Sequence, residues 1–216
     1  ALGNLYFYGL TGFGMGTVWA IDPVVSQALG AGDREAAALG IQRGIVIAVV
    51  VGVFATLLCL PAEGVFRALR QVPEVVPRAA AFVHVSAASI VALLVFVGLR
   101  QGLQAMKKTR AIVGVIIVGN VANLALNMVF VFGRFGFPAM GAVGSAIASV
   151  LARYLMIAVL LVSARHELGP MLRPWRAAAL DRMALLRMFK IGVPIGLQNS
   201  VEFATFASIS ICAGWF

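Results

Sequence analysis

Long apolar runs, separated by short polar segments, make up most of this chain. Each run is long enough to cross a bilayer, because about 20 apolar residues of α-helix span the hydrocarbon core. The runs are rich in Leu, Ala, Val, Ile and Gly and lack the two-residue alternation of barrel strands. The pattern predicts an all-α integral membrane protein, a polytopic bundle of six transmembrane helices over about 1–29, 40–60, 79–103, 111–132, 141–162 and 189–216.

Turn residues and one long polar segment divide the chain further. Gly30 and Gly32 are typical of a helix end, and Asp33 is a candidate N-cap for the next helix. The part from Leu180 to Met188 has the pattern of an amphipathic helix lying on the membrane surface. Both chain ends lie within apolar runs, so we expect a piece of a longer protein. We expect three parts: membrane helices over 1–164, a cytoplasmic linker over 165–188, and a further membrane helix over 189–216.

Composition and charge agree with a membrane protein. The chain is 62% hydrophobic and 12% charged, with a net charge of +9, whereas soluble domains are nearer half apolar and a quarter charged. The basic residues form no face interleaved with aromatic side chains, so the bilayer is the expected partner and nucleic acid is not. The positive-inside rule places in the cytoplasm the alternate loops that hold most of them: Arg34, Arg43, Lys107, Lys108, Arg110, Arg165, Arg173, Arg176, Arg182, Arg187 and Lys190.

Polar residues within the fourth run form one candidate site. Asn120, Asn123 and Asn127 are spaced three and four apart and therefore share one face of a helix. Amides in membrane helices commonly hydrogen-bond a neighbouring helix. Three of them on an otherwise apolar helix also fit the wall of a polar cavity. Both interpretations stay open from the residues alone.

The last run holds a second candidate site, an acid within a membrane helix. A charge there is costly, so Glu202 is a functional candidate unless it only pairs with another buried polar group. Gln198 and Asn199 lie four and three residues before it, where an amide can share its face. The three residues predict a coupling-ion site. Pro194 frees a backbone carbonyl one turn earlier, and with Gly192 and Gly196 it predicts a kink below the acid.

The first run contains residues for which we expect structural roles. Asp22 lies beside Pro23 near its end, and Gln27 follows one turn later. Gly12 and Gly16 form a pair of small residues that lets helix backbones approach closely. Arg100 and Arg153 lie within later runs, where they can pair with an acid or reach the membrane surface.

Nothing in the sequence predicts catalysis. No nucleophile–base–acid set, metal-ligand spacing or cofactor loop is present, so we expect neither an enzyme nor a cofactor. Cys59 and Cys212 lie inside apolar runs as small packing residues.

Four segments together resemble one transporter family. The segment 22–33 resembles the signature after the second helix of multidrug and toxic compound extrusion (MATE) transporters, and 123–133 resembles the fifth helix of that family. The segment 137–148 resembles the turn into the sixth helix, and 190–194 followed by Glu202 resembles the start of the seventh. The resemblance covers essentially the whole chain, in order and with matching spacing.

The resemblance implies a fold and a set of roles. The six predicted spans would be the second to seventh of twelve helices, arranged as two six-helix lobes. Glu202 would lie in the cation site of the second lobe, and Asn123 and Asn127 would line the cavity of the first. The family exports cationic and amphipathic compounds in exchange for Na⁺ or H⁺.

We therefore expect a cation-coupled antiporter that works by alternating access as a monomer in a bacterial inner membrane. A flippase of the same superfamily, moving lipid-linked oligosaccharide or peptidoglycan precursors, is one alternative; its cavity would need cationic residues, for which only Arg100 and Arg153 are available. A non-transporting membrane scaffold is the other.

Overall fold

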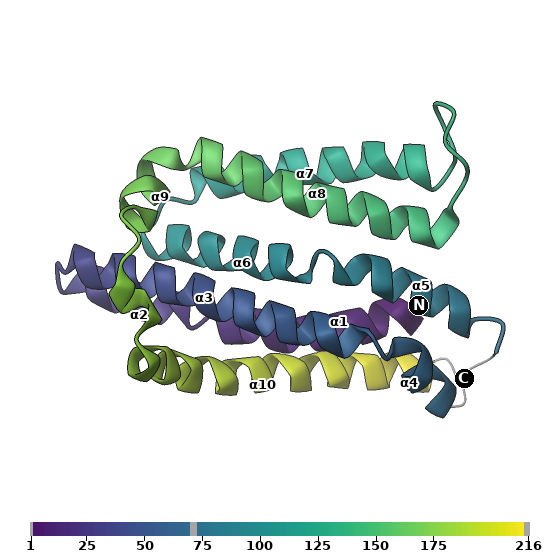
Figure 1. Ribbon diagram of the computed structural model, residues 1–216, viewed down its shortest axis with the longest axis horizontal. Helices are drawn as coiled ribbons and strands as arrows, with labels where there is room; N and C mark the ends of the chain where they lie inside the picture. The colour runs from purple at the N-terminus through teal and green to yellow at the C-terminus, as the bar shows by residue number, and fades with distance from the viewer. Residues whose placement is uncertain (1, 70–72, 214–216) are drawn as a thin grey trace.

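The fold is a bundle of long helices lying side by side (Figure 1). The computed structural model describes residues 2–69 and 73–213, with side chains from 3 to 69 and from 73 to 205. Within these residues it contains helices and no strand, as predicted. The helices are α1 (Leu2–Val18), α2 (Ile21–Gly30), α3 (Arg34–Cys59), α4 (Ala62–Ala68), α5 (Val76–Ala87), α6 (Ile90–Ala105), α7 (Arg110–Phe130), α8 (Gly141–Ser163), α9 (Arg165–Leu172) and α10 (Arg182–Ala213), with a 3-10 turn, η1 (Ala177–Leu180).

Helix α6 lies between two packed groups of helices (Figure 1). On one side Leu94 of α6 joins Phe7, Ile21 and Ile41 of α1, α2 and α3 in a buried apolar cluster. On the other side α6 contributes to a second buried cluster with α7, α8 and α9. Both clusters are close-packed, which is the main source of stability for helices already inside a membrane.

The predicted alternation of the loops is confirmed. The turns at 31–33, 106–109 and 164–181 lie at one end of the bundle, on the left in Figure 1, and the described residues 60–69, 73–75 and 131–140 lie at the other. We call the first the basic end, because it holds most of the basic residues of the chain. That this end faces the cytoplasm stays a prediction.

Four of the six predicted spans have the length and apolarity to cross a membrane. Among the described residues these are α3, α7 and α8 as single helices and α5 with α6 as a pair bent by 47°. The first and last predicted spans do not meet the same test over their described residues: the first is interrupted by a break, and the last carries Lys190 and a polar group, Gln198, Asn199, Ser200 and Glu202.

The break in the first predicted span falls between α1 and α2. Helical hydrogen bonding stops around Trp19 and Ala20, and α2 restarts at Ile21. Pro23 lies in the first turn of α2, where its missing N–H leaves no helical hydrogen bond unmade. The apolar pattern predicts one helix over 1–29, and the proline explains why the chain instead forms two.

The bend between α5 and α6 is held by side chains from neighbouring helices. The Ser89 hydroxyl donates to the Ser86 carbonyl at 2.8 Å, and the Tyr154 hydroxyl of α8 donates to the Ala88 carbonyl at 2.9 Å. Arg153, also of α8, donates to the Ser89 hydroxyl. Backbone groups freed inside a membrane must find such partners, so α8 stabilises the bend.

The residues of the predicted surface helix over 180–188 are not separated from the last helix, and their place at the membrane surface stays a prediction. Residues from Arg182 onward belong to α10, which continues to Ala213 without a break. The Asp181 carboxylate accepts from the Met183 N–H at 3.0 Å and caps the start of this helix. No glycine or proline lies between Arg182 and Lys190 to stop it, so the amphipathic turns are the first turns of the long helix.

The linker after α8 is held against α3 by one buried amide. Gln42 is fully buried, and its Nε2 donates to the carbonyls of Met171 and Pro174 at 2.8 and 3.2 Å. Its Oε1 accepts from the Arg176 N–H at 3.0 Å. Three contacts from a single side chain fix the path of the linker toward α10. The apolar pattern did not single out Gln42 as a candidate. A glutamine inside an apolar run is nevertheless a signal that its amide has buried hydrogen-bond partners.

Candidate functional site

Helices α1 and α10 make an unusually close contact through glycines. A Cβ on Gly16 would lie 2.6 Å from the Cα of Gly196, and one on Gly192 would lie 2.3 Å from the carbonyl oxygen of Thr17. A Cβ on Gly196 would lie 2.7 Å from the carbonyl oxygen of Phe13. Only glycine fits at these positions, because such distances lie inside van der Waals contact. The predicted packing role of Gly16 is confirmed, and Gly192 and Gly196 are its partners on α10.

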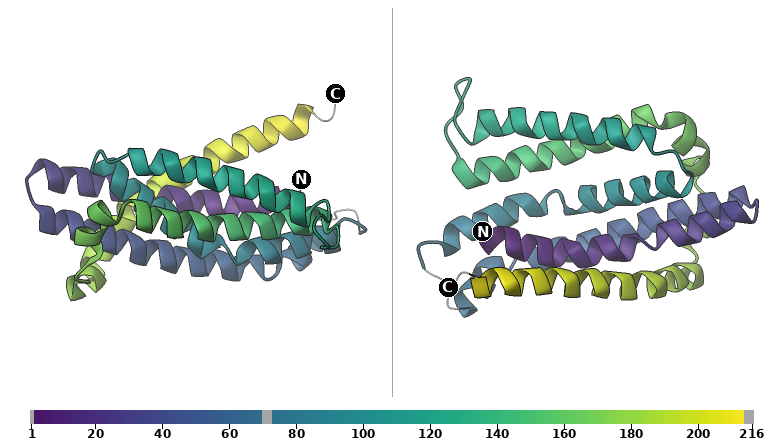
Figure 2. Two further views of the ribbon diagram at one scale, coloured as in Figure 1. Left: turned by 90° about the horizontal axis from the view of Figure 1, so that it is seen from above. Right: turned by 180° about the vertical axis from the view of Figure 1, so that it is seen from behind.

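An interhelical hydrogen bond extends the same contact. The Asn199 side chain donates from Nδ2 to the Gly12 carbonyl at 2.7 Å. Gly12 and Gly16 are one turn apart on α1, and Gly196 and Asn199 are one turn apart on α10. We call this set, Gly12, Gly16, Gly192, Gly196 and Asn199, the glycine contact. Beyond it the two helices separate toward the C-terminal end of α10 (Figure 2).

The candidate acid lies on a different face of α10. Glu202 is exposed, and its Oε1 accepts a hydrogen bond from Gln198 Nε2 at 3.1 Å. Leu197 and Val201, its apolar neighbours, are also exposed. The structure therefore brings Gln198 and Glu202 together as predicted by their spacing. It does not add Asn199 to them, because that amide is bonded to α1.

The proline of α10 faces away from α1. Pro194 is exposed, and helical structure continues on both sides of it. It lies between Gly192 and Gly196, so the helix has one hydrogen bond fewer opposite the glycine contact. The predicted kink stays a prediction.

The three asparagines of α7 separate into two environments. Asn127 Nδ2 donates to the backbone and side-chain oxygens of Asn123 at 2.8 and 2.9 Å. Asn123 Nδ2 in turn reaches Ser149 Oγ of α8 at 3.4 Å. Asn120 is exposed. Asn123 thus links two helices, the first of the two interpretations left open above, while Asn120 is free of that contact.

The two arginines inside the bundle, Arg100 and Arg153, pair with no acid in the part of the chain that the structure describes. The Arg153 guanidinium lies 5.0 Å from the centre of the Phe7 ring and donates to Ser89 at the α5–α6 bend. Arg100 is half-buried, and its Nε–H has no hydrogen-bond partner among the described residues. Cation–π contact and a hydroxyl acceptor replace the expected carboxylate at Arg153.

Asp22 and Gln27 lie on α2 at the basic end. The Asp22 carboxylate accepts from Ser26 Oγ at 3.2 Å, a contact within one helix turn. Gln27 is exposed. Neither residue belongs to the glycine contact, and the structural roles expected for them stay a prediction.

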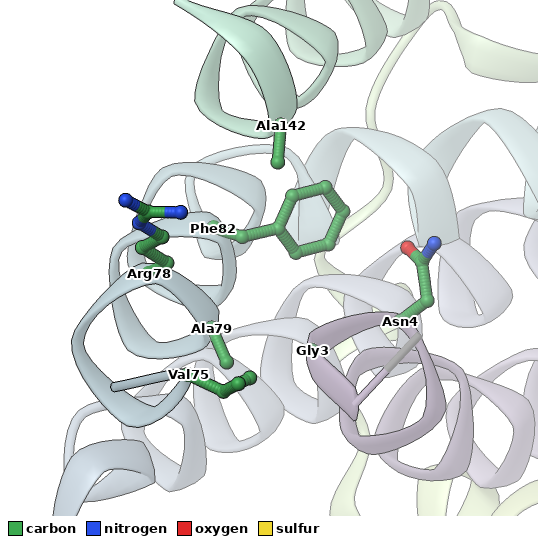
Figure 3. A pocket seen from close by; sticks show the side chains of 7 residues that line it. All are labelled: Gly3, Asn4, Val75, Arg78, Ala79, Phe82 and Ala142. Carbon is green, nitrogen blue, oxygen red and sulfur yellow. The ribbon is translucent and has the colours of Figure 1, made fainter. Parts of the chain in front are cut away.

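A small cavity lies at the end of the bundle opposite the basic end (Figure 3). Asn4 of α1, Arg78 and Phe82 of α5, and Ala142 of α8 are among its lining residues, and Phe82 stands between the helices. Its volume is about 190 Å³, whereas pockets for small molecules measure about 300–1,000 Å³. This cavity is too small for a drug-sized compound.

Comparison with known proteins identifies the family. The MatE family model matches residues 1–129, more than half of the chain. The chain belongs to the MATE family. Curated relatives match over nearly all of its length: the multidrug resistance protein NorM of Photobacterium profundum is 28% identical over 205 residues, 92% of this chain. A probable NorM of Agrobacterium fabrum is 30% identical over 218 residues, 99% of this chain.

Solved MATE structures share the fold. A eukaryotic MATE transporter superposes with a TM-score of 0.83 at 21% identity, over 97% of this chain and 46% of that one. Inward-facing and outward-facing structures of a MATE family transporter give 0.75 and 0.74. Because these two TM-scores are nearly equal, the comparison does not assign this structure to the inward-facing or the outward-facing state. The names of these proteins describe transporters and resistance proteins, not enzymes.

The chain spans under half the length of the relatives it matches. It covers 44% of the NorM of Photobacterium profundum and 46% of that of Agrobacterium fabrum. The activity of a whole transporter is therefore a matter for proposal.

Proposed function

We propose that this chain forms the first lobe, without its first helix, and the first helix of the second lobe of a cation-coupled antiporter. The antiporter exports cationic or amphipathic compounds by alternating access across a bacterial inner membrane, acting as a monomer with Na⁺ or H⁺ as coupling ion. Membership of the MATE family and the names of the NorM relatives support the transport of small organic molecules.

The arrangement of α10 is the observation that carries this proposal. One face of the helix is fixed to α1 by the glycine contact, and another presents the Gln198–Glu202 pair. A cation bound at Glu202 therefore acts on the same helix that packs against α1. An ion shifts a conformational equilibrium only if it binds one state more tightly than the other. Movement of α10 against α1 changes the surroundings of Glu202 and supplies that difference.

The Gln198–Glu202 pair suits either coupling ion. Protonation of Glu202 removes a charge that is costly within a membrane. For Na⁺, rotation of the Gln198 amide places its oxygen beside the carboxylate, and oxygen ligands of this kind bind hard cations. Gln198 and Glu202 do not favour Na⁺ over H⁺, so the experiment must distinguish the two ions.

An efflux assay with the two gradients imposed separately tests the proposal. Cells producing the protein as its gene encodes it are loaded with a fluorescent organic cation, and a Na⁺ or pH gradient is applied. We expect one gradient to drive export and Glu202→Gln to abolish that dependence. Glu63→Gln is the matched control, because Glu63 pairs with Arg67 on α4 and takes no part in the Gln198–Glu202 pair. Full ion-dependent export by Glu202→Gln would refute the role of Glu202.

The flippase alternative has weaker support. A phosphate-binding cavity needs cationic side chains that are free to bind, and Arg153 is already in contact with Ser89 and Phe7. A scaffold would show no export under either gradient, so the same assay distinguishes it.

A further inference from the structure

An apolar groove follows α3 inward from the basic end. Its first part is a cavity of about 450 Å³ between α3 and the start of α10, lined by Val46, Val50, Leu186 and Phe189 among others. Apart from Arg182, every residue lining it is apolar. A second cavity of about 370 Å³, between α3 and α1, shares Val50 and Phe189 with the first. The two adjoin and form one groove.

The length of the groove matches one leaflet of a bilayer. Its lining on α3 runs from Val46 to Leu58. Twelve residue steps of an α-helix rise about 18 Å, and half of the hydrocarbon core is about 15 Å. The outward-facing residues of α3 beside it, Val49, Val53 and Leu57, are apolar and exposed, as expected of a lipid-facing helix.

Charge is concentrated at one end of this groove. Arg182 lines it at the first turn of α10. Arg43 lies one turn before Val46 on α3, and its Nη2 donates to the Ala178 carbonyl at 3.1 Å. The Nε–H of Arg43 is buried without a hydrogen-bond partner among the described residues.

Two acids near this end have partners other than Arg182 and Arg43. The Asp181 carboxylate accepts from the Met183 N–H, and Glu35 lies 3.7 Å from Arg176 in an ion pair. Neither neutralises Arg182 or Arg43 in the structure. The end of the groove therefore offers cationic donors to a negative group.

We propose that this groove binds an anionic phospholipid of the cytoplasmic leaflet. Its phosphate contacts Arg182, with Arg43 beside it, and one acyl chain lies over Val50 and Phe189. An apolar channel of one-leaflet depth with cations at the membrane surface fits this molecule in both its parts. A soluble anion would leave the apolar part unexplained, and a neutral lipid would leave the arginines unexplained. The proposal is independent of the coupling ion and of Glu202.

Native mass spectrometry of the gene-encoded protein tests the site. The protein is incubated with phosphatidylglycerol or with phosphatidylcholine of identical chains, and bound lipid is counted. We expect preferential retention of phosphatidylglycerol, weakened about fivefold by Arg182→Gln, the factor corresponding to one basic residue at an anionic surface. Arg187→Gln is the matched control, since Arg187 is exposed on the same helix and lies outside the groove.

A second variant tests the acyl-chain part. Val50 is 62% exposed, so Val50→Trp fills the groove without displacing the core, and thermal unfolding checks that the fold is kept. We expect it to reduce retention of phosphatidylglycerol although no charge is changed. Equal retention of the two lipids, equal effects of Arg182→Gln and Arg187→Gln, or full retention by Val50→Trp would each overturn the proposal. Density for a protein helix in the groove of the gene-encoded protein would do the same.

Discussion

Adding a single methyl group at Gly192 tests how tightly α10 is held to α1. In Gly192→Ala the new Cβ would lie 2.3 Å from the Thr17 carbonyl oxygen and 3.0 Å from its carbon. To reach an ordinary separation near 3.4 Å, α10 must move back by about 1 Å. A backbone carbonyl cannot rotate away as a side chain can, so the helix as a whole has to shift.

The size of the effect follows from the cost of overpacking. Such insertions typically cost about 1–3 kcal/mol, which corresponds to a population change of about 5- to 150-fold. The cost applies only where α1 and α10 are in contact. We therefore expect Gly192→Ala to reduce the population of the packed arrangement by at least about fivefold.

Spin-label distances measure this shift directly. Spin labels are placed at Gln27 on α2 and at Arg187 on α10, in a background without the native cysteines. Both positions are exposed. The labels report the distance at the basic end between α10 and α2, the helix that follows α1. We expect a longer distance to gain population in Gly192→Ala. Gly9→Ala is the control, because a Cβ on Gly9 meets nothing within 4 Å. An unchanged distance distribution in Gly192→Ala would show that the glycine contact does not hold the helices together.

Three further substitutions test other contacts. Gln42→Leu leaves two carbonyls and one N–H of the linker without their partner. We therefore expect the free energy of unfolding to fall by about 2–4 kcal/mol and hydrogen exchange over residues 165–181 to become faster than in the parent protein. Unchanged exchange there would contradict the anchoring role. Arg153→Met removes the donor to Ser89 at the α5–α6 bend, and we expect a lower thermal unfolding temperature that Arg153→Lys partly restores; a variant as stable as the parent would show that the bend does not need it. Asn123→Ala should lower the free energy of unfolding by only about 0.6 kcal/mol, the average for a hydrogen bond between membrane helices. Loss of export by a variant that keeps this stability would instead assign Asn123 to a substrate cavity.

Much of the fold follows from the apolar pattern because that pattern is dense and regular. Helices α3, α7 and α8 end within a few residues of the predicted limits, since Pro61, the basic turn at 107–110 and the glycine-rich turn at 133–136 interrupt the runs. The bend between α5 and α6 was not predicted. It depends on donors from α3 and α8, and sequence order does not show which helices are neighbours.

The candidate site was predictable in its local part only. The spacing of Gln198 and Glu202 was enough to predict their hydrogen bond, because four residues form one helical turn. The role of Asn199 was not, since its partner Gly12 lies 187 residues away. The sequence predicts close helix packing at Gly16 and a kink near Gly196, but only the structure shows that these two glycines meet.

The central claim is that export is exchanged for a cation bound at Glu202, and ion movement in proteoliposomes tests it most directly. The gene-encoded protein is reconstituted with an organic cation on one side, and the flux of H⁺ or Na⁺ is recorded as the substrate moves. We predict that addition of substrate starts a counterflow of one of these ions and that Glu202→Gln stops it. Substrate transport with no movement of either ion, or an equal counterflow in Glu202→Gln, would contradict the account.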